Sequence, residues 1–504
     1  MIAQAHAATL NGIDALPIVV EVDLLKGDNR FYLVGLPDKA VQESEERVRA
    51  SIRNCDMTFP NMKVICNLAP GDIRKEGPSL DLPIAIAILA ASGQVPKSSL
   101  ESTVLLGELG LDGRLRPIDG AVSVALMCHA LGYQRLILPM KNAAEAAITQ
   151  TVEVYGMNSL TEVAELLNGS LSFEPFTHAQ GGDARVSYDV DYSDVKGQRQ
   201  ATRALEIAAA GGHNLLMIGP PGSGKSMLAA RLPGLLPPLD AREALEISMI
   251  QSLAGELKDG AIGRRRPFRA PHHSASMAAL TGGGLKVRPG EVSLAHLGVL
   301  FLDELPEFDR RVLDSLRQPL ETGSTLVARA NAHIRYPSRV QLVAAMNPCR
   351  CGYLGDPAMA CNKAPRCGAD YQARISGPLY DRIDLHVDVP AVSAADLSLP
   401  APREGSAEIA ARVAAARARQ GERYAAAGIR TNAEAEGEVL AEGARLEPAA
   451  QALLAEAAEK MRLSARGYTR ALRVARTIAD LAGSPTTARP HIAEALSYRR
   501  LNLT

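Results

Sequence analysis

The feature that most constrains the fold of this chain is a glycine-rich segment at residues 219–226. A fully apolar run at 215–218 precedes it, and a segment with helical character follows at 227–231. This order of strand, loop and helix is the context in which the pattern GxxxxGK[ST] binds phosphate. Its eight residues are Gly219, Pro220, Pro221, Gly222, Ser223, Gly224, Lys225 and Ser226. The glycines let backbone N–H groups face phosphate oxygens, Lys225 can reach the β- and γ-phosphates, and Ser226 can ligate Mg²⁺. The segment predicts a parallel α/β nucleotide-binding domain.

Two further apolar runs end in polar residues suited to phosphate chemistry. Residues 299–302 lead into Asp303 and Glu304, and residues 340–346 lead into Asn347. Asp303 can hold Mg²⁺ through its water shell, Glu304 can polarise an attacking water, and Asn347 can orient that water. An acidic pair at a strand end is common on protein surfaces, and asparagine is often a cap or turn residue. Their pairing with the glycine-rich segment favours the catalytic interpretation.

Length and charge restrict the remaining possibilities. A chain of 504 residues is too long for one compact domain, so we expect two to four. Lys and Arg number 55 against 56 Asp and Glu, which excludes a uniformly basic nucleic-acid coat but leaves room for a local basic channel. No apolar run approaches ~18 residues, so a membrane span is not expected. Asp14 and Pro17 break the first apolar stretch, which does not predict a signal peptide, and we expect a cytoplasmic protein.

Composition divides the chain into four regions. Residues 1–168 alternate β-like runs (16–23, 30–34, 63–68 and 135–139) with helical ones (84–91 and 122–131), which predicts a mixed α/β domain. Residues 169–190 lack periodicity and are predicted to be a linker. Residues 191–395 hold the nucleotide-binding motifs. Residues 396–504 are rich in Ala, Arg and Glu without sustained heptads, which favours a packed helical lid over a coiled coil.

Several longer motifs resemble the magnesium-chelatase-like YifB/ComM family of bacterial AAA+ ATPases. They are GPPGSGKS at 219–226, RPFRAPHHSAS at 266–276, GGGLKVRPGEVSLAHLGVLFLDELPEF at 282–308, NPCRCGYLGD at 347–356, ISGPLYDRIDLHVDVP at 375–390 and SARGYTRALRVARTIADL at 464–481. The similarity covers nearly the whole chain. It implies an α/β fold with a P-loop AAA+ core, an N-terminal Lon-protease-like α/β domain and a C-terminal helical lid.

The resemblance also implies roles for individual residues. Asn347 is the expected sensor-1 residue, Arg382 the arginine finger and Arg466 the sensor-2 residue, with Arg470 and Arg473 on the same predicted helix as alternatives. A finger adds positive charge where the transferring phosphoryl group develops negative charge. Without the resemblance, each arginine is expected to be a surface or salt-bridging residue. A finger that acts on a neighbouring subunit requires a closed ring, so a homo-hexamer is implied.

The N-terminal region is similar to Lon-type proteases in two segments. Residues 68–79 resemble the stretch around the nucleophile, with Ser79 at the serine position, and residues 107–120 resemble the stretch before the catalytic lysine. After Gly120 the chain continues Ala-Val-Ser-Val, and Lys97 and Lys141 lie far away in sequence. A serine needs a base within hydrogen-bond reach to become nucleophilic. We therefore expect a Lon-like fold without peptidase activity, used for substrate binding or ring assembly.

Two segments correspond to the family's insertions into the ring pore. Residues 251–298 interrupt the path from the glycine-rich segment to Asp303, and residues 325–339 predict a hairpin with its tip near Asn331. Together they hold a local excess of cations: Arg264, Arg265, Arg266, Arg269, Lys286, Arg288, Arg329, His333 and Arg335. Such a lining suits a phosphate backbone, although solvated loops or intersubunit ion pairs explain it equally well. His272 and His273 are expected to point apart and to be structural.

The resemblance and the basic segments together imply DNA, single-stranded or branched, as the partner. The expected activity is Mg²⁺-dependent ATP hydrolysis coupled to helicase action or branch migration during recombination of transforming DNA. Three alternatives stay open: a chelatase motor subunit that works through a partner protein, an ATP-dependent protease, which the missing lysine disfavours, and a protein-remodelling ATPase without DNA activity.

Four of the seven cysteines lie in one short segment, at Cys349, Cys351, Cys361 and Cys367. Four thiolates can ligate Zn²⁺ tetrahedrally and so order a loop. The spacing differs from the usual paired CxxC pattern, and reduced thiols without metal are the alternative. An odd number of cysteines in a long chain argues against a disulfide framework.

Overall fold

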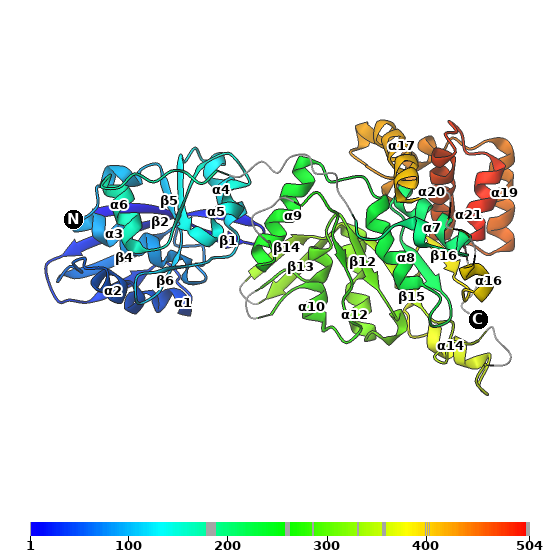
Figure 1. Cartoon of the computed structure of the whole chain (residues 1–504), viewed down its shortest axis with the longest axis horizontal. Coiled ribbons are helices and arrows are strands. Elements are labelled where there is room, and N and C mark those ends of the chain that lie inside the picture. The colour runs from blue at the N-terminus through cyan, green and yellow to red at the C-terminus, as the bar shows by residue number, and fades with distance from the viewer. Residues whose placement is uncertain are drawn as a thin grey trace. The chain divides into compact units, whose positions relative to one another are not determined.

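The computed structural model describes residues 2–177, 188–257, 263–284, 287–329, 332–354, 359–398, 400, 402 and 404–499 (Figure 1). The chain forms two compact units. Unit 1 comprises Met1–Ala184 and Ala241–Gly263, and unit 2 comprises Arg185–Asp240 and Arg264–Thr504. Among the helices of these described ranges, none combines the length and apolar character that a membrane crossing requires.

Unit 1 is built on a seven-stranded mixed sheet with the order β3-β4-β2-β1-β5-β8-β9. Its strands are β1 (Ile2–Asn11), β2 (Asp14–Leu25), β3 (Phe31–Val34), β4 (Lys63–Ala69), β5 (Thr103–Leu105), β8 (Arg135–Pro139) and β9 (Glu153–Met157), and a separate pair is formed by β6 (Glu108–Leu109) and β7 (Leu115–Arg116). Its helices are α1 (Lys39–Gln42), α2 (Ser44–Asn54), α3 (Asp81–Ala91), α4 (Ala121–Ala130), α5 (Met140–Ala147), α6 (Leu160–Asn168) and α9 (Ala241–Ala254), with short 3₁₀ turns at Pro78–Leu80 and Lys97–Leu100.

The sequence predicted β2, β3, β4, β8, α3 and α4 among these elements, but it did not predict β1. β1 is rich in alanine, which has a low strand propensity, and it is held by an antiparallel hairpin with β2 that runs from Ile2 opposite Asp23 to Asn11 opposite Asp14. Each of the residues of α3 is buried, so this helix forms the centre of the core. Cross-strand pairing therefore overrides the local preference of β1.

Helix α9 belongs to unit 1, although it follows the glycine-rich segment in sequence. Its Ser252 hydroxyl donates to Glu145 Oε1 at 2.7 Å, and the Ala121 amide donates to the same oxygen at 2.9 Å. Burial raises the pKa of Glu145. The expected insertion at 251–298 is thus not one continuous insertion. The elements β11 and α11 lie within these residues and belong to unit 2.

Unit 2 contains a five-stranded sheet with the order β11-β12-β15-β10-β16, and every pair in it is parallel. Its strands are β10 (Leu215–Ile218), β11 (Phe268–Arg269), β12 (Val299–Leu302), β15 (Gln341–Met346) and β16 (Leu385–Asp388), with a separate hairpin of β13 (Ser324–Arg329) and β14 (Ala332–Pro337). The helices around the sheet are α7 (Arg199–Gly211), α8 (Lys225–Arg231), α10 (Met277–Thr281), α11 (Glu291–Leu294), α12 (Arg310–Ser315), α13 (Arg317–Thr322), α14 (Arg366–Gln372), α15 (Gly377–Tyr380) and α16 (Ala394–Leu397), and 3₁₀ turns lie at Tyr192–Asp194, Leu232–Leu235 and Leu305–Glu307.

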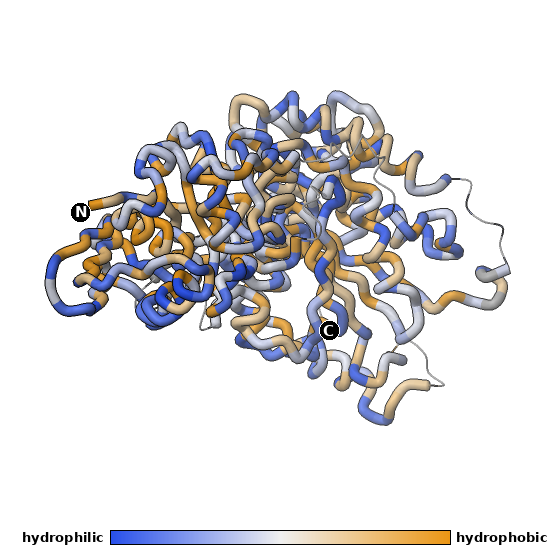
Figure 2. Tube along the Cα trace, turned by 60° about the vertical axis from the view of Figure 1, so that its left-hand side comes forward, coloured by the Kyte–Doolittle hydropathy of each residue, from blue (hydrophilic) through white to orange (hydrophobic). Residues whose placement is uncertain are grey.

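The sheet of unit 2 is buried on both faces, as expected of parallel strands. Leu215 and Met217 face one hydrophobic core, and Leu216 and Ile218 face another. In Figure 2, orange hydrophobic stretches and blue hydrophilic stretches alternate along the tube. Burial on both faces explains why these strands read as continuous apolar runs rather than alternating ones.

The C-terminal helices α17 (Ser406–Tyr424), α18 (Gly437–Ala444), α19 (Pro448–Lys460), α20 (Ala465–Leu481) and α21 (Arg489–Ser497) carry the 3₁₀ turns Ala425–Ala427 and Asn432–Glu434 between them. They lie together in the orange-to-red part of Figure 1. Val413, Leu454 and Val474 share a hydrophobic core with Leu215 and Val343 of the sheet. Helix α7 connects them to the sheet, because it contacts α17 and α20 as well as β10 and β16.

A buried polar network fixes the helical lid. The Arg476 side chain is fully buried, and its Nη2 donates to Asp480 Oδ1 at 2.8 Å. Arg423 Nη1 and Asn432 Nδ2 donate to Asp480 Oδ2 at 3.0 and 2.9 Å. One buried carboxylate thus neutralises the buried guanidinium of Arg476 and the half-buried one of Arg423.

Replacing this carboxylate should destabilise the lid. Asp480→Ala leaves the buried Arg476 and the half-buried Arg423 without this counter-charge and is expected to lower the free energy of unfolding by about 3–5 kcal/mol. Chemical denaturation followed by circular dichroism measures the change. The matched control is Glu456→Ala, which removes an exposed ion pair with Lys460 and should leave the midpoint unchanged. Equal midpoints for both variants would contradict the proposed role of the network.

Candidate nucleotide site

Three neighbouring strands end at the same edge of the unit 2 sheet. In the order β12, β15, β10, their carboxyl ends lead into Asp303, Asn347 and Gly219. The register aligns Leu302 with Ala344, and Ile218 with Met346. Crevices outside the carboxyl ends of parallel strands are where open α/β sheets bind ligands. The three sequence motifs therefore meet at one place.

The glycine-rich loop has the backbone geometry that its composition predicts. Gly222 and Gly224 have φ values of 74° and 87°, a region that other residues rarely adopt. A Cβ atom on Gly219 would lie 2.0 Å from the carbonyl oxygen of Val389. Helix α8 begins at Lys225, directly after Gly224. These positions leave little freedom to replace the glycines.

Lys225 lies within the loop. Its ammonium donates to the carbonyl oxygens of Gly219 and Pro220, both at 2.8 Å, and to Asn347 Oδ1 at 3.3 Å. Burial lowers the pKa of Lys225, while the charges of Asp303 and Glu304 oppose this shift. An ammonium held by neutral oxygens keeps its positive charge available for an anion.

Ser226 and Asp303 are adjacent. The Ser226 hydroxyl donates to Asp303 Oδ2 at 2.6 Å, and both side chains are accessible to solvent. A hydroxyl and a carboxylate are oxygen donors of the kind that Mg²⁺ prefers. This donor set fits Mg²⁺.

Glu304 contacts a histidine that the sequence analysis treated as structural. Glu304 has a left-handed backbone (φ 50°) and places Oε2 3.3 Å from His273 Nδ1. The expectation that His272 and His273 point apart is wrong, because their ring centroids lie 4.1 Å apart. His273 follows the short strand β11, the neighbour of β12, and this adjacency brings it to Glu304. His273 is thus a site residue that could be found only once β11 was recognised as a strand.

Arg382 is engaged within its own chain. Its Nη1 donates to the carbonyl oxygen of Pro378 at 2.6 Å, and its Nη2 pairs with the Glu321 carboxylate. Burial, together with the charges of Arg317 and Arg466, lowers the pKa of Arg382. Arg382 and Arg466 are therefore close enough to influence each other.

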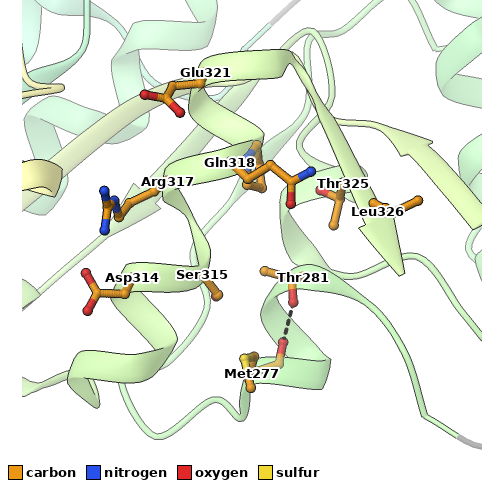
Figure 3. A pocket seen from close by; sticks show the side chains of 10 residues that line it. Met277, Thr281, Asp314, Ser315, Arg317, Gln318, Glu321, Thr325 and Leu326 are labelled. Carbon is orange, nitrogen blue, oxygen red and sulfur yellow. Dashed lines mark hydrogen bonds between the residues drawn. The ribbon is translucent and has the colours of Figure 1, made fainter. Parts of the chain in front are cut away.

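Glu321 also lines an open pocket of about 450 Å³ (Figure 3). In Figure 3, Asp314 and Arg317 extend to the same side of the pocket. The lining residues are Met277, Thr281, Asp314, Ser315, Arg317, Gln318, Pro319, Glu321, Thr325 and Leu326. None of these residues belongs to the glycine-rich loop, so the pocket lies outside the nucleotide motifs.

The three sensor-2 candidates on α20 differ in their surroundings. Arg470 is buried and its Nε lies 3.4 Å from Asp384 Oδ1. Arg473 donates to the Ala435 carbonyl at 2.7 Å. Arg466 is exposed at the start of the helix. Of the three, Arg466 is the one whose side chain stays available at the surface.

Three of the four clustered cysteines come together. The sulfurs of Cys349, Cys351 and Cys367 all lie within 4.8 Å of one another. Cys349 is buried, and its Sγ is 3.0 Å from that of Cys351. The hydrogen bond with Cys349 lowers the pKa of Cys351 to about 6. Cys361 interacts with both Cys351 and Cys367.

The expected basic segments are only partly available to a partner. The structure has the hairpin as β13 and β14, with Leu326 opposite Arg335 and with Arg335 exposed. Arg269 pairs with Glu291 at 2.6 and 2.8 Å, and Arg266 donates to the Pro237 and Leu297 carbonyls. These two arginines therefore stabilise the fold. Lys286 and the hairpin tip at Asn331 lie outside the described residues, as do the side chains of Arg329 and His333.

In unit 1, Ser79 lies in the 3₁₀ turn Pro78–Leu80. The position after Gly120 is occupied by helix α4, whose Val122 is buried. Lys97 donates to the carbonyl oxygen of Ile2 at 2.5 Å. Lys75 is fully buried and donates to the carbonyl oxygen of Pro70.

A parallel sheet with a P-loop, an acidic strand end, a polar neighbouring strand end and a helical lid defines an AAA+ protein of the magnesium-chelatase type. Residues 191–397 match the family model described as magnesium chelatase, subunit ChlI. Residues 20–142 match the model for subunit ChlI of Mg-chelatase, and residues 403–499 match that for the ChlI C-terminal region.

Relatives that align over nearly the whole chain identify the family more specifically. The chain is 43% identical to the competence protein ComM of Haemophilus influenzae over 506 residues, which cover 99% of this chain and 98% of the relative. It is also 43% identical to YifB of Salmonella typhimurium, over 99% and 97% of the two chains. A Lon protease of Syntrophomonas wolfei is 28% identical over 176 residues, 32% of this chain and 21% of that protein. The chain belongs to the YifB/ComM family of magnesium-chelatase-like AAA+ proteins, and the expected fold class is confirmed.

The contact between His273 and Glu304 leads to a prediction about turnover. His273→Ala should lower the kcat of ATP hydrolysis about tenfold to a hundredfold, because Glu304, the residue expected to polarise the attacking water, would be misplaced. The apparent KM for ATP should change little. Steady-state ATPase assays measure both constants.

A histidine far from the sheet edge in sequence supplies the control for this prediction. His129→Ala removes an exposed side chain of α4 in unit 1, and it should leave kcat near the wild-type value. In a Glu304→Gln background, His273→Ala should have no further effect. An independent loss in that background would show that His273 acts without Glu304.

Proposed function

We propose that this protein is a Mg²⁺-dependent ATP hydrolase that couples hydrolysis to translocation on DNA as a homo-hexamer. The observation that carries the proposal is the convergence of Lys225, Ser226, Asp303, Glu304 and Asn347 at one sheet edge. These residue types are the ones that bind phosphates and activate water in P-loop enzymes. The cytoplasm, where ATP is available, is the compartment that we propose for this activity.

Each group has a distinct task in the proposed reaction. Backbone N–H groups of residues 219–226 and the Lys225 ammonium hold the phosphates. Ser226 and Asp303 would hold Mg²⁺, which neutralises charge on the phosphate oxygens. Glu304 accepts a proton from the attacking water, and Asn347 orients that water. Contact between Asn347 and Lys225 supports this arrangement, because it brings the water-orienting amide next to the phosphate-binding ammonium.

We assign Arg382 and Arg466 to the nucleotide of the adjacent subunit. Their closeness supports a joint role, since both charges would then act on one phosphoryl group. A role in the neighbouring subunit's site is what makes a closed ring necessary. The hexamer is part of the proposal for this reason.

DNA is the proposed partner on two grounds. The relative in H. influenzae is named a competence protein, and we extend to this chain a role in recombining transforming DNA, through helicase action or branch migration. Arg335 on the hairpin, together with Arg264, Arg265 and Arg288, is exposed. Cations at these positions suit contact with a phosphate backbone.

A chelatase-like or protein-remodelling motor without DNA activity is the second candidate. The family models that match are all named after a magnesium chelatase subunit, which favours it. Against a protease, the lysine expected after Gly120 is replaced by buried apolar residues of α4. We propose that unit 1 has no peptidase activity and serves in binding or assembly.

The main prediction concerns a labelled four-way DNA junction incubated with the purified protein. With ATP the junction should be converted, and with a non-hydrolysable analogue it should not. Glu304→Gln should reduce ATP hydrolysis by roughly 10²–10⁴-fold and abolish conversion, because the general base is lost while nucleotide binding persists. Native gel electrophoresis and phosphate release measure the two effects.

The other possible results of the junction and ATPase assays distinguish between the candidate functions. ATP hydrolysis that no DNA stimulates, with no junction conversion, would favour the chelatase-like or protein-remodelling motor. Undiminished hydrolysis by Glu304→Gln would contradict the site itself. Fluorescent ADP binding confirms that the variant still holds nucleotide.

A second prediction addresses the hairpin. Arg335→Ala should weaken binding to single-stranded DNA uniformly across sequences. It should also reduce the slope of log K against log salt by about 1, because one phosphate fewer is neutralised by the protein. Fluorescence anisotropy at several salt concentrations measures this slope. Arg489→Ala, an equal charge change on an exposed residue of α21, is the control. Identical slopes for the two variants would exclude Arg335 from the DNA interface.

A further inference from the structure

The cysteine cluster is organised by two short turns. The amide of Gly352 donates to the Cys349 carbonyl at 3.0 Å, and the amide of Ala364 donates to the Cys361 carbonyl at 3.0 Å. Cys367 follows in α14, with its amide bonded to the Lys363 carbonyl at 3.0 Å. Backbone turns of this kind direct cysteine side chains of both segments toward one point.

The sulfur positions suit one tetrahedral ion. Zn–S bonds of about 2.3 Å place the sulfurs of a tetrahedral site about 3.8 Å apart. The sulfurs of Cys349, Cys351 and Cys367 already lie within 4.8 Å of one another, and Cys361, in the same short segment, would supply the fourth thiolate. Soft thiolate ligands select Zn²⁺ over Mg²⁺.

The cluster touches the phosphate-binding loop directly. A Cβ atom on Gly352, whose φ is 87°, would lie 2.5 Å from Cδ and 2.8 Å from Cγ of Pro221. The backbone of Gly352 is therefore packed closely against Pro221. On the other side, Cys349 follows Asn347 by two residues, and Asn347 accepts from Lys225.

The remaining contacts tie the cluster to the rest of unit 2. Gln372 Nε2 donates to the Pro348 carbonyl at 2.9 Å, which connects α14 to the residue between Asn347 and Cys349. A Cβ atom on Gly368 would lie 2.6 Å from Cδ2 of Leu354. Ordering of the cysteine segment thus fixes both the sensor residue and one wall of the glycine-rich loop.

We infer that Cys349, Cys351, Cys361 and Cys367 bind one Zn²⁺, and that this ion controls nucleotide binding by holding Gly352 against Pro221 and Asn347 beside Lys225. The part of the inference that concerns nucleotide rests on the proposed ATPase function; the metal site does not. Loss of the ion would free the segment and loosen the loop that cradles the phosphates. The ion takes no part in the chemical step.

The first measurement is the metal content of the full-length protein, purified without chelators, by mass spectrometry. One Zn²⁺ per chain is expected, falling below half an equivalent in the Cys351→Ser/Cys367→Ser variant. Cys55→Ser, a half-buried cysteine of unit 1, should retain the metal. Less than half an equivalent in the wild-type protein, or a disulfide within the cluster, would overturn the site.

The second measurement separates the metal from its effect on nucleotide. Gly352→Ala leaves all four ligands in place but forces the segment away from Pro221. It should keep its Zn²⁺ and bind a fluorescent ATP analogue roughly fivefold to tenfold more weakly, as should the double cysteine variant. Unchanged affinity in variants without the metal would overturn the control of nucleotide binding. Absence of nucleotide binding in the wild-type protein with Zn²⁺ present would refute the proposed function instead.

Discussion

The parallel pairing of β12, β15 and β10 is the constraint on which the nucleotide site depends. Register alone brings the residues after Leu302, Met346 and Ile218 to the same edge, although they lie far apart in sequence. Every residue of these three strands is buried, so other elements of the fold must cover both faces of the sheet. Helix α7, with the C-terminal helices packed on it, supplies one cover, and the apolar side chains of α10 to α13 supply much of the other. The position of the polar side chains is therefore a consequence of apolar packing at some distance from them.

The charges at this edge of the sheet are arranged so that they favour the binding of an anion. Among the described residues, Lys225 has carbonyl, amide and hydroxyl oxygens as its hydrogen-bond partners, while Asp303 is engaged by Ser226. Burial lowers the pKa of Lys225 because a charged ammonium loses hydration, and a bound phosphate would restore a counter-charge. The same reasoning distinguishes Lys225 from Arg476, whose charge is neutralised by Asp480.

The sequence was sufficient for the parts of this structure that local chemistry determines. The apolar runs at 215–218 and 299–302 became β10 and β12 with unchanged limits, and the fold class followed from the resemblance. Prediction from the sequence failed where contacts between distant parts of the chain determine the structure. β1 is an alanine-rich strand stabilised by its partner β2, and the two-residue strand β11 has no periodicity to detect. Without β11, the proximity of His273 to Glu304 could not be deduced. Likewise, the count of cations in the basic segments could not reveal that Arg266 and Arg269 are used for internal contacts.

Arg382 would have to leave its present partners before it could act on the nucleotide of a neighbouring subunit in a ring. A finger must present its guanidinium to a neighbouring phosphate, yet here Nη2 pairs with Glu321 and Nη1 with a carbonyl oxygen. The two partners are unequally placed, since the Arg382 side chain is 9% exposed and that of Glu321 is 53% exposed. A solvated carboxylate loses little when it gives up an ion pair, because water replaces the guanidinium. A γ-phosphate carries more charge than a carboxylate and can accept bidentate hydrogen bonds from arginine. Exchange of Glu321 for phosphate is therefore energetically feasible, and in the proposed hexamer Glu321 would hold Arg382 in a defined orientation until a neighbouring subunit binds.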